Sequence, residues 1–210
     1  MYIYAFGSVC RGEVDTGSDI DLLAVVEGFD KRFDPDMYSI YTLSRLKEIW
    51  EQGNPFAWHL ALESKLLFSC DNIDVLGNLG KPNLYLNGIE DCKKFYNIFN
   101  KSVASIKASQ SSIVFDLSTV FLAIRNFATC FSLAMSKHPD FSRSSAKRLE
   151  KHSIPISDAS YNTYEKSRIL CTRGLGKDID QDQIKFALKE IDTIDKWMCD
   201  LIKMMVEKND

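Results

Sequence analysis

Residues 6–26 read FGSVCRGEVDTGSDIDLLAVV, and this stretch decides the fold of the first part of the chain. Gly7 and Ser8 follow a short apolar run, residues 2–6. Ten residues after this pair, a second apolar run of strand composition begins within the segment 19–26. The pattern predicts two β-strands that are joined by a turn and a short helical crossover.

The second predicted strand opens with two carboxylates, Asp19 and Asp21. Residues two apart on a strand point to the same face of the sheet, so we expect these side chains to project together. A pair of carboxylates is what Mg²⁺ prefers in proteins, with water and phosphate oxygens in its other positions. Gly7 would let a phosphate approach the backbone, and Ser8 offers a hydroxyl and an N–H at a helix start. The stretch therefore predicts a site for a metal ion and a phosphate.

This arrangement resembles the polymerase-β-type nucleotidyltransferase superfamily, whose mark is Gly-Ser, a spacer and then Asp-x-Asp. It is most similar to the minimal nucleotidyltransferases, in which this spacing and an Arg-Gly-(Asp/Glu) after the turn are usual. The resemblance covers the first third of the chain. The residues that carry it are Gly7, Ser8, Arg11, Gly12, Glu13, Ser18, Asp19 and Asp21.

The resemblance implies a Mg²⁺-dependent enzyme that moves a nucleoside monophosphate from an NTP, with ATP as the expected donor, to an acceptor hydroxyl. It favours a protein or RNA acceptor, in the setting of a toxin–antitoxin or phage-defence module. Asp19 and Asp21 would be catalytic and would hold the metal. The nucleotide-binding residues that it implies are Gly7, Ser8, Arg11 and Ser18.

A third strand is predicted at residues 37–41, where the superfamily usually carries a third carboxylate. Here the strand reads MYSIY, and the nearest acids, Asp34 and Asp36, lie just before it. This departure leaves a second hypothesis open: a catalytically weak, nucleotide-binding or antitoxin-like regulatory subunit without the third carboxylate.

Two helices are predicted after this strand, over residues 42–52 and 56–63, and then an edge strand at 65–69. His59 and Glu63 are four residues apart and share one face of the second helix. They are candidate catalytic residues, with Glu63 as a substitute base. The alternative is that they form a local pair without a role in chemistry.

Residues 71–87 are rich in glycine, proline and asparagine, which predicts a linker between a domain at 1–86 and a domain at 87–210. After the linker the apolar residues recur with helical period, which predicts an all-α bundle. The expected class is therefore α+β, a small mixed sheet followed by a bundle. The helices are expected near 89–106, 113–138, 142–151, 157–171 and 184–205.

The bundle resembles either the helical domain of antibiotic nucleotidyltransferases or the HEPN type that accompanies minimal nucleotidyltransferases. The first likeness leaves a small-molecule acceptor as a further alternative. The HEPN nuclease mark is Arg, four residues, then His, and here Arg125 is followed by Cys130 at the place of the histidine. Because imidazole is needed for RNA cleavage, we expect no ribonuclease activity. A basic helix face is expected from Arg143, Lys147, Arg148 and Lys151.

The composition is that of a soluble protein, with 45% hydrophobic residues and a formal net charge of −3. The 6 cysteines form no CxxC pair, which favours scattered thiols in a reducing cytoplasm. Arg125 and Asn126 lie at the centre of the most apolar segment, 117–135, so we expect a buried helix and no membrane partner. The expected partners are a nucleotide and the acceptor, and an oligomer is compatible with the sequence.

Overall fold

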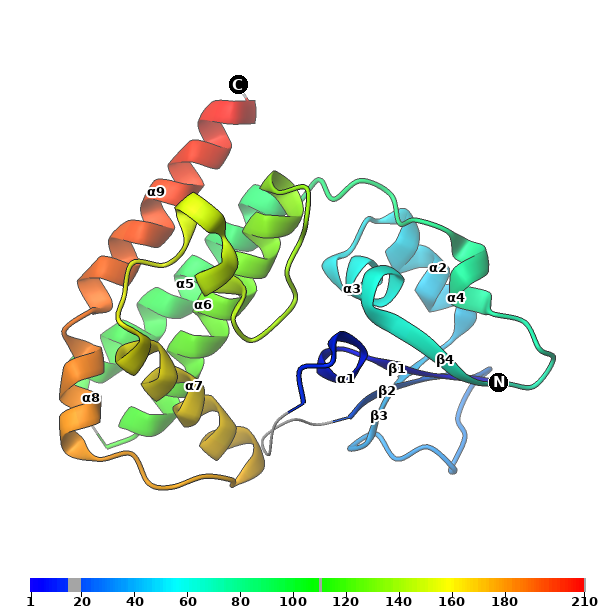
Figure 1. Ribbon diagram of the computed structural model, residues 1–210, viewed down its shortest axis with the longest axis horizontal. Helices are drawn as coiled ribbons and strands as arrows, with labels where there is room; N and C mark the ends of the chain where they lie inside the picture. The colour runs from blue at the N-terminus through cyan, green and yellow to red at the C-terminus, as the bar shows by residue number, and fades with distance from the viewer. Residues whose placement is uncertain (15–19, 110, 210) are drawn as a thin grey trace. The chain divides into compact units, whose positions relative to one another are not determined.

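The computed structural model describes residues 1–14, 20–109 and 111–209. The chain divides into two compact units, unit 1 at Met1–Leu86 and unit 2 at Asn87–Asp210. Unit 1 contains a four-stranded mixed sheet, and unit 2 is helical (Figure 1). The predicted α+β class is confirmed.

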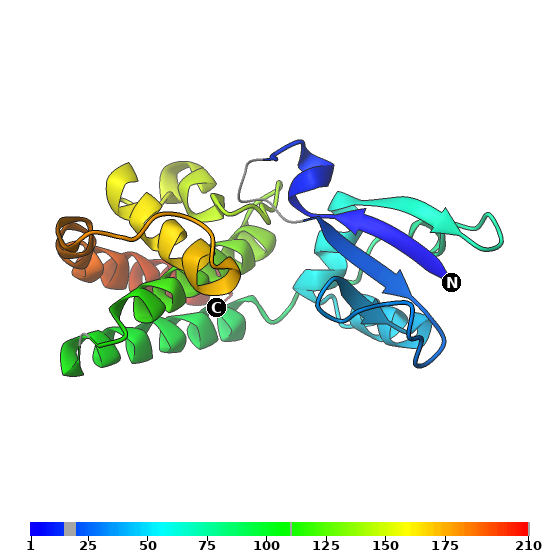
Figure 2. The same cartoon turned by 90° about the horizontal axis from the view of Figure 1, so that it is seen from below.

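The sheet of unit 1 has the order β3-β2-β1-β4. β1 (Tyr2–Phe6) pairs antiparallel with β2 (Asp21–Val25) and with β4 (Ser64–Ser69), while β2 pairs parallel with β3 (Tyr38–Tyr41). Figure 2 shows β4 beside β1 at the edge of the sheet. The first strand of the chain is therefore an inner strand, between β2 and β4.

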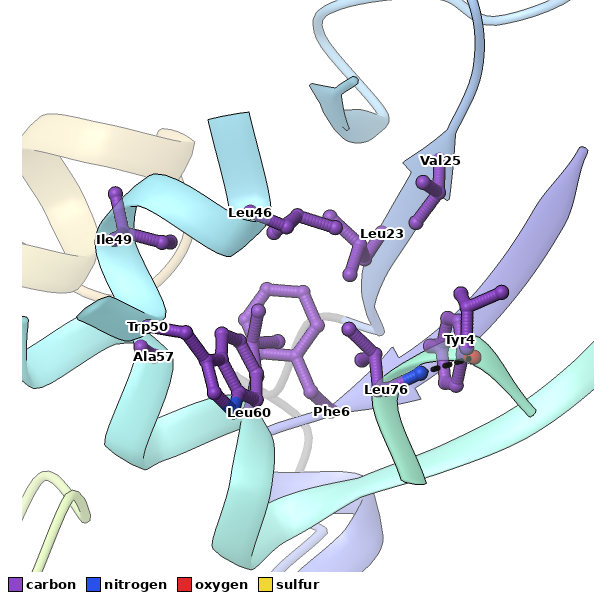
Figure 3. Packing of buried hydrophobic residues seen from close by; sticks show 11 residues of the cluster. Tyr4, Phe6, Leu23, Val25, Leu46, Ile49, Trp50, Ala57, Leu60 and Leu76 are labelled. Atoms are coloured by element: carbon purple, nitrogen blue, oxygen red, sulfur yellow. Dashed lines mark hydrogen bonds between the residues drawn. The ribbon is translucent and has the colours of Figure 1, made fainter. Parts of the chain in front are cut away.

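Three helices of unit 1 cover one face of this sheet (Figure 1). They are α2 (Leu43–Glu51), α3 (Pro55–Glu63) and α4 (Val75–Leu79). Thr42 and Asn54 cap the first two by accepting a backbone N–H, as their residue types favour. The core lies between this face and the helices, with Tyr4, Phe6, Leu23 and Val25 from the strands (Figure 3). From the helices it includes Leu46, Ile49, Trp50, Ala57, Leu60, Val75 and Leu76.

Part of the other face of the sheet, over β2, is covered by the loop that precedes β3. Phe33 packs there against Ala24 and Val26, and its ring meets the ring of Tyr38 edge-on at 5.1 Å. This loop therefore has its own small apolar anchor, and it holds the turn before β3 in place.

The predicted linker, residues 71–87, is wrong over most of its length. Val75 and Leu76 are buried in the core of unit 1, and Asp74 caps α4 by accepting the N–H of Gly77. Beyond α4, the Asn83 N–H donates to the Trp50 carbonyl at 3.0 Å, and the Trp58 indole donates to the Asn83 carbonyl at 3.0 Å. This polar segment was predicted as a linker from its composition, but a few specific contacts make it part of the folded unit.

Unit 2 is built on α5 (Gly88–Ala108) and α6 (Ile113–Met135), which pack along each other. α6 is long and apolar enough to cross a membrane by length and composition, but most of it is buried among the other helices, as the sequence predicts. α7 (Asp158–Arg173) begins at its cap Ser157 and ends at Gly174. Two further helices, α8 (Gln181–Leu188) and α9 (Ile191–Asn209), complete the unit.

Two predictions for unit 2 are wrong in detail. The single last helix is broken between α8 and α9, where the Ala187 carbonyl accepts from the Tyr164 hydroxyl at 2.8 Å and from the Glu190 N–H at 3.0 Å. The expected basic helix is instead two short 3-10 helices, η1 (Ser145–Arg148) and η2 (Glu150–His152). In each place a longer-range contact takes a carbonyl that a continuing α-helix would use: Ala187 accepts from Tyr164, and Ala146 accepts from the Ile154 N–H at 2.8 Å.

Candidate functional site

The Gly-Ser turn is a tight structure at the end of β1. Gly7 has φ +74° and ψ −141°, and the one-turn helix α1 (Ser8–Arg11) follows it at once. The Gly7 carbonyl accepts the N–H groups of Cys10 and Arg11 at 3.1 and 3.3 Å. Because this φ is strained for any side chain, the turn requires glycine.

The carboxylate of Asp21 lies directly against this turn. Asp21 pairs with Phe6 in the antiparallel register of β1 and β2, one residue before Gly7. A Cβ atom added to Gly7 would come within 2.4 Å of Asp21 Oδ2. The structure thus brings Gly7 and Asp21 together, as the sequence predicts, and the missing side chain of Gly7 makes room for the carboxylate. The predicted residues Ser18 and Asp19 lie outside the described residues.

A hollow of about 600 Å³ opens beside Asp21, between the start of β2 and the turn before β3. This is the size of a small-molecule site. The residues that line it are Ile20, Asp21, Leu22, Pro35, Asp36, Met37, Tyr38 and Ser39.

The register of β3 decides which of its side chains could join Asp21. Leu23 of β2 pairs with Ser39 of β3, and residues paired across two strands point to the same face. Asp21 and Leu23 are two residues apart on β2, so their side chains lie on the same face of the sheet. Ser39 is therefore the residue of β3 that is nearest to Asp21 on that face. A hydroxyl therefore stands where a carboxylate was expected, as the sequence indicates.

Asp36 is an acid in the wall of the hollow for which the sequence analysis gave no role. It lies in the turn before β3, where Asp34 Oδ1 accepts the Asp36 N–H at 3.0 Å and the Asp34 carbonyl accepts the Met37 N–H at 2.9 Å. The Asp34 carboxylate is thus used to form the turn, and Asp36 is exposed beside the hollow that Asp21 also lines. The signal in the sequence was an acid just before the third strand.

Arg11, Glu63 and His59 are also brought together, in a cluster on the side of α1. Arg11 Nη1 pairs with Glu63 Oε2, and His59 Nε2 lies 2.9 Å from the same oxygen. Arg11 Nε donates to Glu13 Oε2 at 2.8 Å. The side chains of Arg11, Glu63 and His59 are only 19%, 13% and 13% exposed, so this cluster is largely shielded from water.

The charge of Arg11 is held by its two carboxylate partners. Burial alone would lower the pKa of Arg11, but the hydrogen bonds and negative charges of Glu13 and Glu63 outweigh it and raise the pKa. Arg11 is therefore a fixed cation whose Nε and Nη1 are already used inside unit 1.

The predicted pair of carboxylates, Asp19 and Asp21, suits a divalent cation by type, since hard cations bind oxygen. Over the part of the chain that the structure describes, no three His, Cys, Asp or Glu side chains gather as a metal site. Asp21 is the described member of the predicted pair, and the space next to Gly7 admits its carboxylate at the Gly-Ser turn. The described residues therefore supply one of the two predicted metal ligands, Asp21.

The polar residues singled out in unit 2 have structural partners. Arg125 Nη2 donates to the Phe141 carbonyl at 2.7 Å, and the Ser145 hydroxyl donates to the Arg125 carbonyl at 3.0 Å, so this residue ties α6 to the following loop. Cys130 is buried in the bundle. Of the expected basic face, Arg143, Lys147 and Arg148 lie in ion pairs with Glu165, Asp158 and Asp140.

Comparison with known protein families supports the predicted nucleotidyltransferase class for unit 1. Residues 2–78 match the family model described as nucleotidyltransferase domain. The matched segment contains the Gly-Ser turn, Asp21, Asp36 and the cluster around Arg11, and it supports nucleotidyl transfer as the general activity. No curated protein matches the chain.

Proposed function

We propose that unit 1 transfers a nucleoside monophosphate from an NTP, with ATP as the favoured donor, to a hydroxyl group of a protein or RNA. The observation that carries this proposal is the contact of the Asp21 carboxylate with Gly7, beside a hollow of about 600 Å³. The family match at residues 2–78 supports the reaction class. The choice of acceptor, and of a toxin–antitoxin or phage-defence setting, rests on the resemblance to minimal nucleotidyltransferases.

Each predicted residue of the Gly-Ser turn and of the segment at the start of β2 has a part in this proposal. Gly7 leaves the backbone open to the phosphates, and Ser8 offers its hydroxyl to them. Asp19 and Asp21 would hold Mg²⁺, which when bound neutralises charge on phosphate oxygens during phosphoryl-type transfer. Ser18 would contact the nucleotide from the same segment.

Asp36 is the proposed proton acceptor for the attacking hydroxyl. Its carboxylate is exposed beside the same hollow as Asp21, whereas Glu63 is already paired with Arg11. General base catalysis requires a group within hydrogen-bond reach of the proton that it removes. The hollow is where such a hydroxyl and the Asp21 carboxylate would meet.

The test is transfer of label from ATP in the presence of Mg²⁺ to a component of a cell lysate, with pyrophosphate release followed in parallel. We expect the wild type to label an acceptor and Asp21→Asn to lose labelling. Asp36→Asn should slow transfer by about 10²–10⁴-fold with nucleotide affinity kept, the range for a general base. Glu27→Gln, which removes a carboxylate of the loop before β3 that does not line the hollow, is the matched control. Labelling that is equal in wild type and Asp21→Asn would refute the proposal.

A second candidate is a regulatory subunit that binds nucleotide without turnover. It is favoured by the absence of any acid in the sequence of β3 and by the ion pair that engages Glu63. Two results together would select this candidate. The wild type would bind ATP with Mg²⁺ and lose that binding in Asp21→Asn, and the wild type would give no labelled product and no pyrophosphate.

A further inference from the structure

Among the residues that the structure describes, few contacts hold α1, the one-turn helix that follows Gly7 in the Gly-Ser turn. α1 is described over all its four residues, Ser8–Arg11, and none of them is buried. A helix of one turn is not stable by itself, because nucleation costs more than its few hydrogen bonds return. The Cys10 thiol donates to the Ala5 carbonyl at 3.3 Å, but that contact only joins α1 to the strand it follows. The position of α1 therefore depends on its contacts with another element.

Arg11 provides that contact at the last residue of α1. Its guanidinium pairs with Glu63 at the end of α3, and it also holds Glu13, just after the helix. α3 is a firm support, since Ala57 and Leu60 are fully buried in the core of unit 1. The ion pair thus joins a weakly anchored helix to a well anchored one.

His59 extends the link to the strand before the turn. Its ring packs edge-on against the ring of Phe6 at 5.5 Å, and its Nε2 lies 2.9 Å from the Glu63 oxygen that Arg11 contacts. Phe6 is the last residue of β1, directly before Gly7, and it pairs with Asp21 of β2. One cluster therefore contacts both sides of the Gly-Ser turn, β1 before it and α1 after it.

We propose that Arg11, Glu63 and His59 form a clamp that positions the Gly-Ser turn, and that Glu63 is a positioning residue rather than the general base. Glu63 Oε2 faces Arg11 and His59, the Glu63 side chain is only 13% exposed, and Glu63 is not among the residues that line the hollow, so its carboxylate belongs to the clamp rather than to the place where the acceptor would bind. Arg11 acts on phosphate binding through the position of α1. This inference rests on the proposed function, because the turn that is positioned is the proposed phosphate site.

The experiment compares wild type with Glu63→Gln, Arg11→Gln and the double variant. Amide hydrogen exchange is followed at Cys10, Arg11, Gly12 and Glu13, whose N–H groups form the α1 turn. We expect exchange at these amides to quicken and affinity for Mg²⁺ with a non-hydrolysable ATP analogue to fall about tenfold in each single variant, as for loss of one partly buried charged contact. The rate of transfer at saturating nucleotide should change by less than about threefold, since no group that removes a proton is lost.

The double variant separates a clamp from a direct phosphate contact. If Arg11 acts only through Glu63, the double variant binds the analogue no more weakly than either single variant, because residues of one unit are not additive. Arg11→Lys keeps the charge but not the two-pronged geometry, and should show a smaller loss of the same kind. Glu48→Gln, which breaks the Arg45–Glu48 ion pair on α2, is the matched control and should change none of these quantities.

Three results would overturn the inference. One is a loss of about 10²–10⁴-fold in the transfer rate of Glu63→Gln with unchanged affinity and exchange, which would make Glu63 the base. Another is additive loss of affinity in the double variant. The third is unchanged exchange at α1 in both single variants. Failure of the proposed function looks different: wild type would not bind the analogue, or Asp21→Asn would bind it equally well, while the exchange result would still decide whether the clamp holds α1.

Discussion

At the scale of single residues, two close contacts are important in unit 1: one is possible because Gly7 has no side chain, and the other is made by the hydroxyl of Tyr4. Gly7 leaves room for the Asp21 carboxylate. Tyr4 is fully buried in the core, and its hydroxyl donates to Asp74 Oδ1 at 2.8 Å. The same hydroxyl accepts the Leu76 N–H at 3.1 Å (Figure 3). Each of these contacts joins a strand to a segment far along the chain or across a turn.

Gly7→Ala should abolish Mg²⁺-dependent nucleotide binding, because the new methyl group would collide with Asp21 Oδ2. Gly12→Ala is the control, since Gly12 has nearly the same φ, +73° against +74°, and an added Cβ there meets no atom of the described residues within 4 Å. Gly12→Ala should cost about 1–2 kcal/mol of stability, because Gly12 is in the left-handed region. Gly7→Ala should cost more, because its ψ of −141° is outside that region and its new methyl group also meets Asp21. Isothermal titration with Mg²⁺ and ATP checks the difference, and equal affinities in the two variants would contradict it.

Tyr4→Phe should destabilise unit 1 by about 1–3 kcal/mol, because the buried Leu76 N–H would lose its acceptor. Urea unfolding followed by tryptophan fluorescence measures this. Tyr2→Phe removes an exposed hydroxyl that donates to Asp71 at 2.7 Å, and its effect should be clearly smaller. A loss in Tyr4→Phe no larger than that in Tyr2→Phe would show that this contact does not hold α4 to the sheet.

At the scale of elements, the sequence predicted what depends on local pattern. Apolar runs and caps placed β1, β2, β3, α2, α3 and β4 close to their observed bounds. The errors fall where tertiary contacts decide. The indole N–H groups of Trp50 and Trp58 donate to the backbone carbonyls of Gly80 and Asn83. Such contacts leave no periodic pattern in the sequence of a polar segment.

The same distinction holds for the candidate site. The Gly-Ser turn and Asp21 were predictable, since both belong to one motif whose spacing is local. Asp36 was not assigned, because its place beside the hollow depends on the register of β3 and on the turn that Asp34 caps. The link between Arg11 and Glu63 joins residues 52 positions apart, so only the fold brings them together.

A fragment that ends after Leu86 should fold, and one that ends after Asn78, where the family match stops, should be less stable. The shorter fragment lacks Gly80 and Asn83, which leaves both indole N–H groups of Trp50 and Trp58 without their carbonyl partners. Unfolding of the two fragments in urea provides the comparison. Equal midpoints would mean that residues 79–86 are a linker after all.

At the scale of the whole molecule, both units contain buried tyrosines. Burial raises the pKa of Tyr4 in unit 1 and of Tyr161 and Tyr164 in unit 2, in each case from the ordinary value of 10.0. The folded chain therefore keeps these phenols neutral at a pH where the unfolded chain ionises them.

Stability should accordingly fall as the pH rises above 10, and should keep falling until the folded phenols themselves ionise. The sign follows from the raised pKa: the unfolded state releases the proton first, so alkali favours unfolding, whereas below pH 10 this contribution is fully present. Urea midpoints at a series of pH values test this. Tyr4→Phe should flatten the slope for unit 1 alone, and an unchanged slope in that variant would contradict the assignment.

The position of β1 inside the sheet has a consequence for synthesis. β1 is made before both of its neighbours, β2 and β4, and β4 spans Ser64–Ser69. As the chain leaves the ribosome, β1 can pair early with β2, but its other edge stays open until some sixty more residues have emerged. Pairing between strands so far apart is slow, so that open edge is the place where a nascent chain would be captured by a chaperone or by another chain.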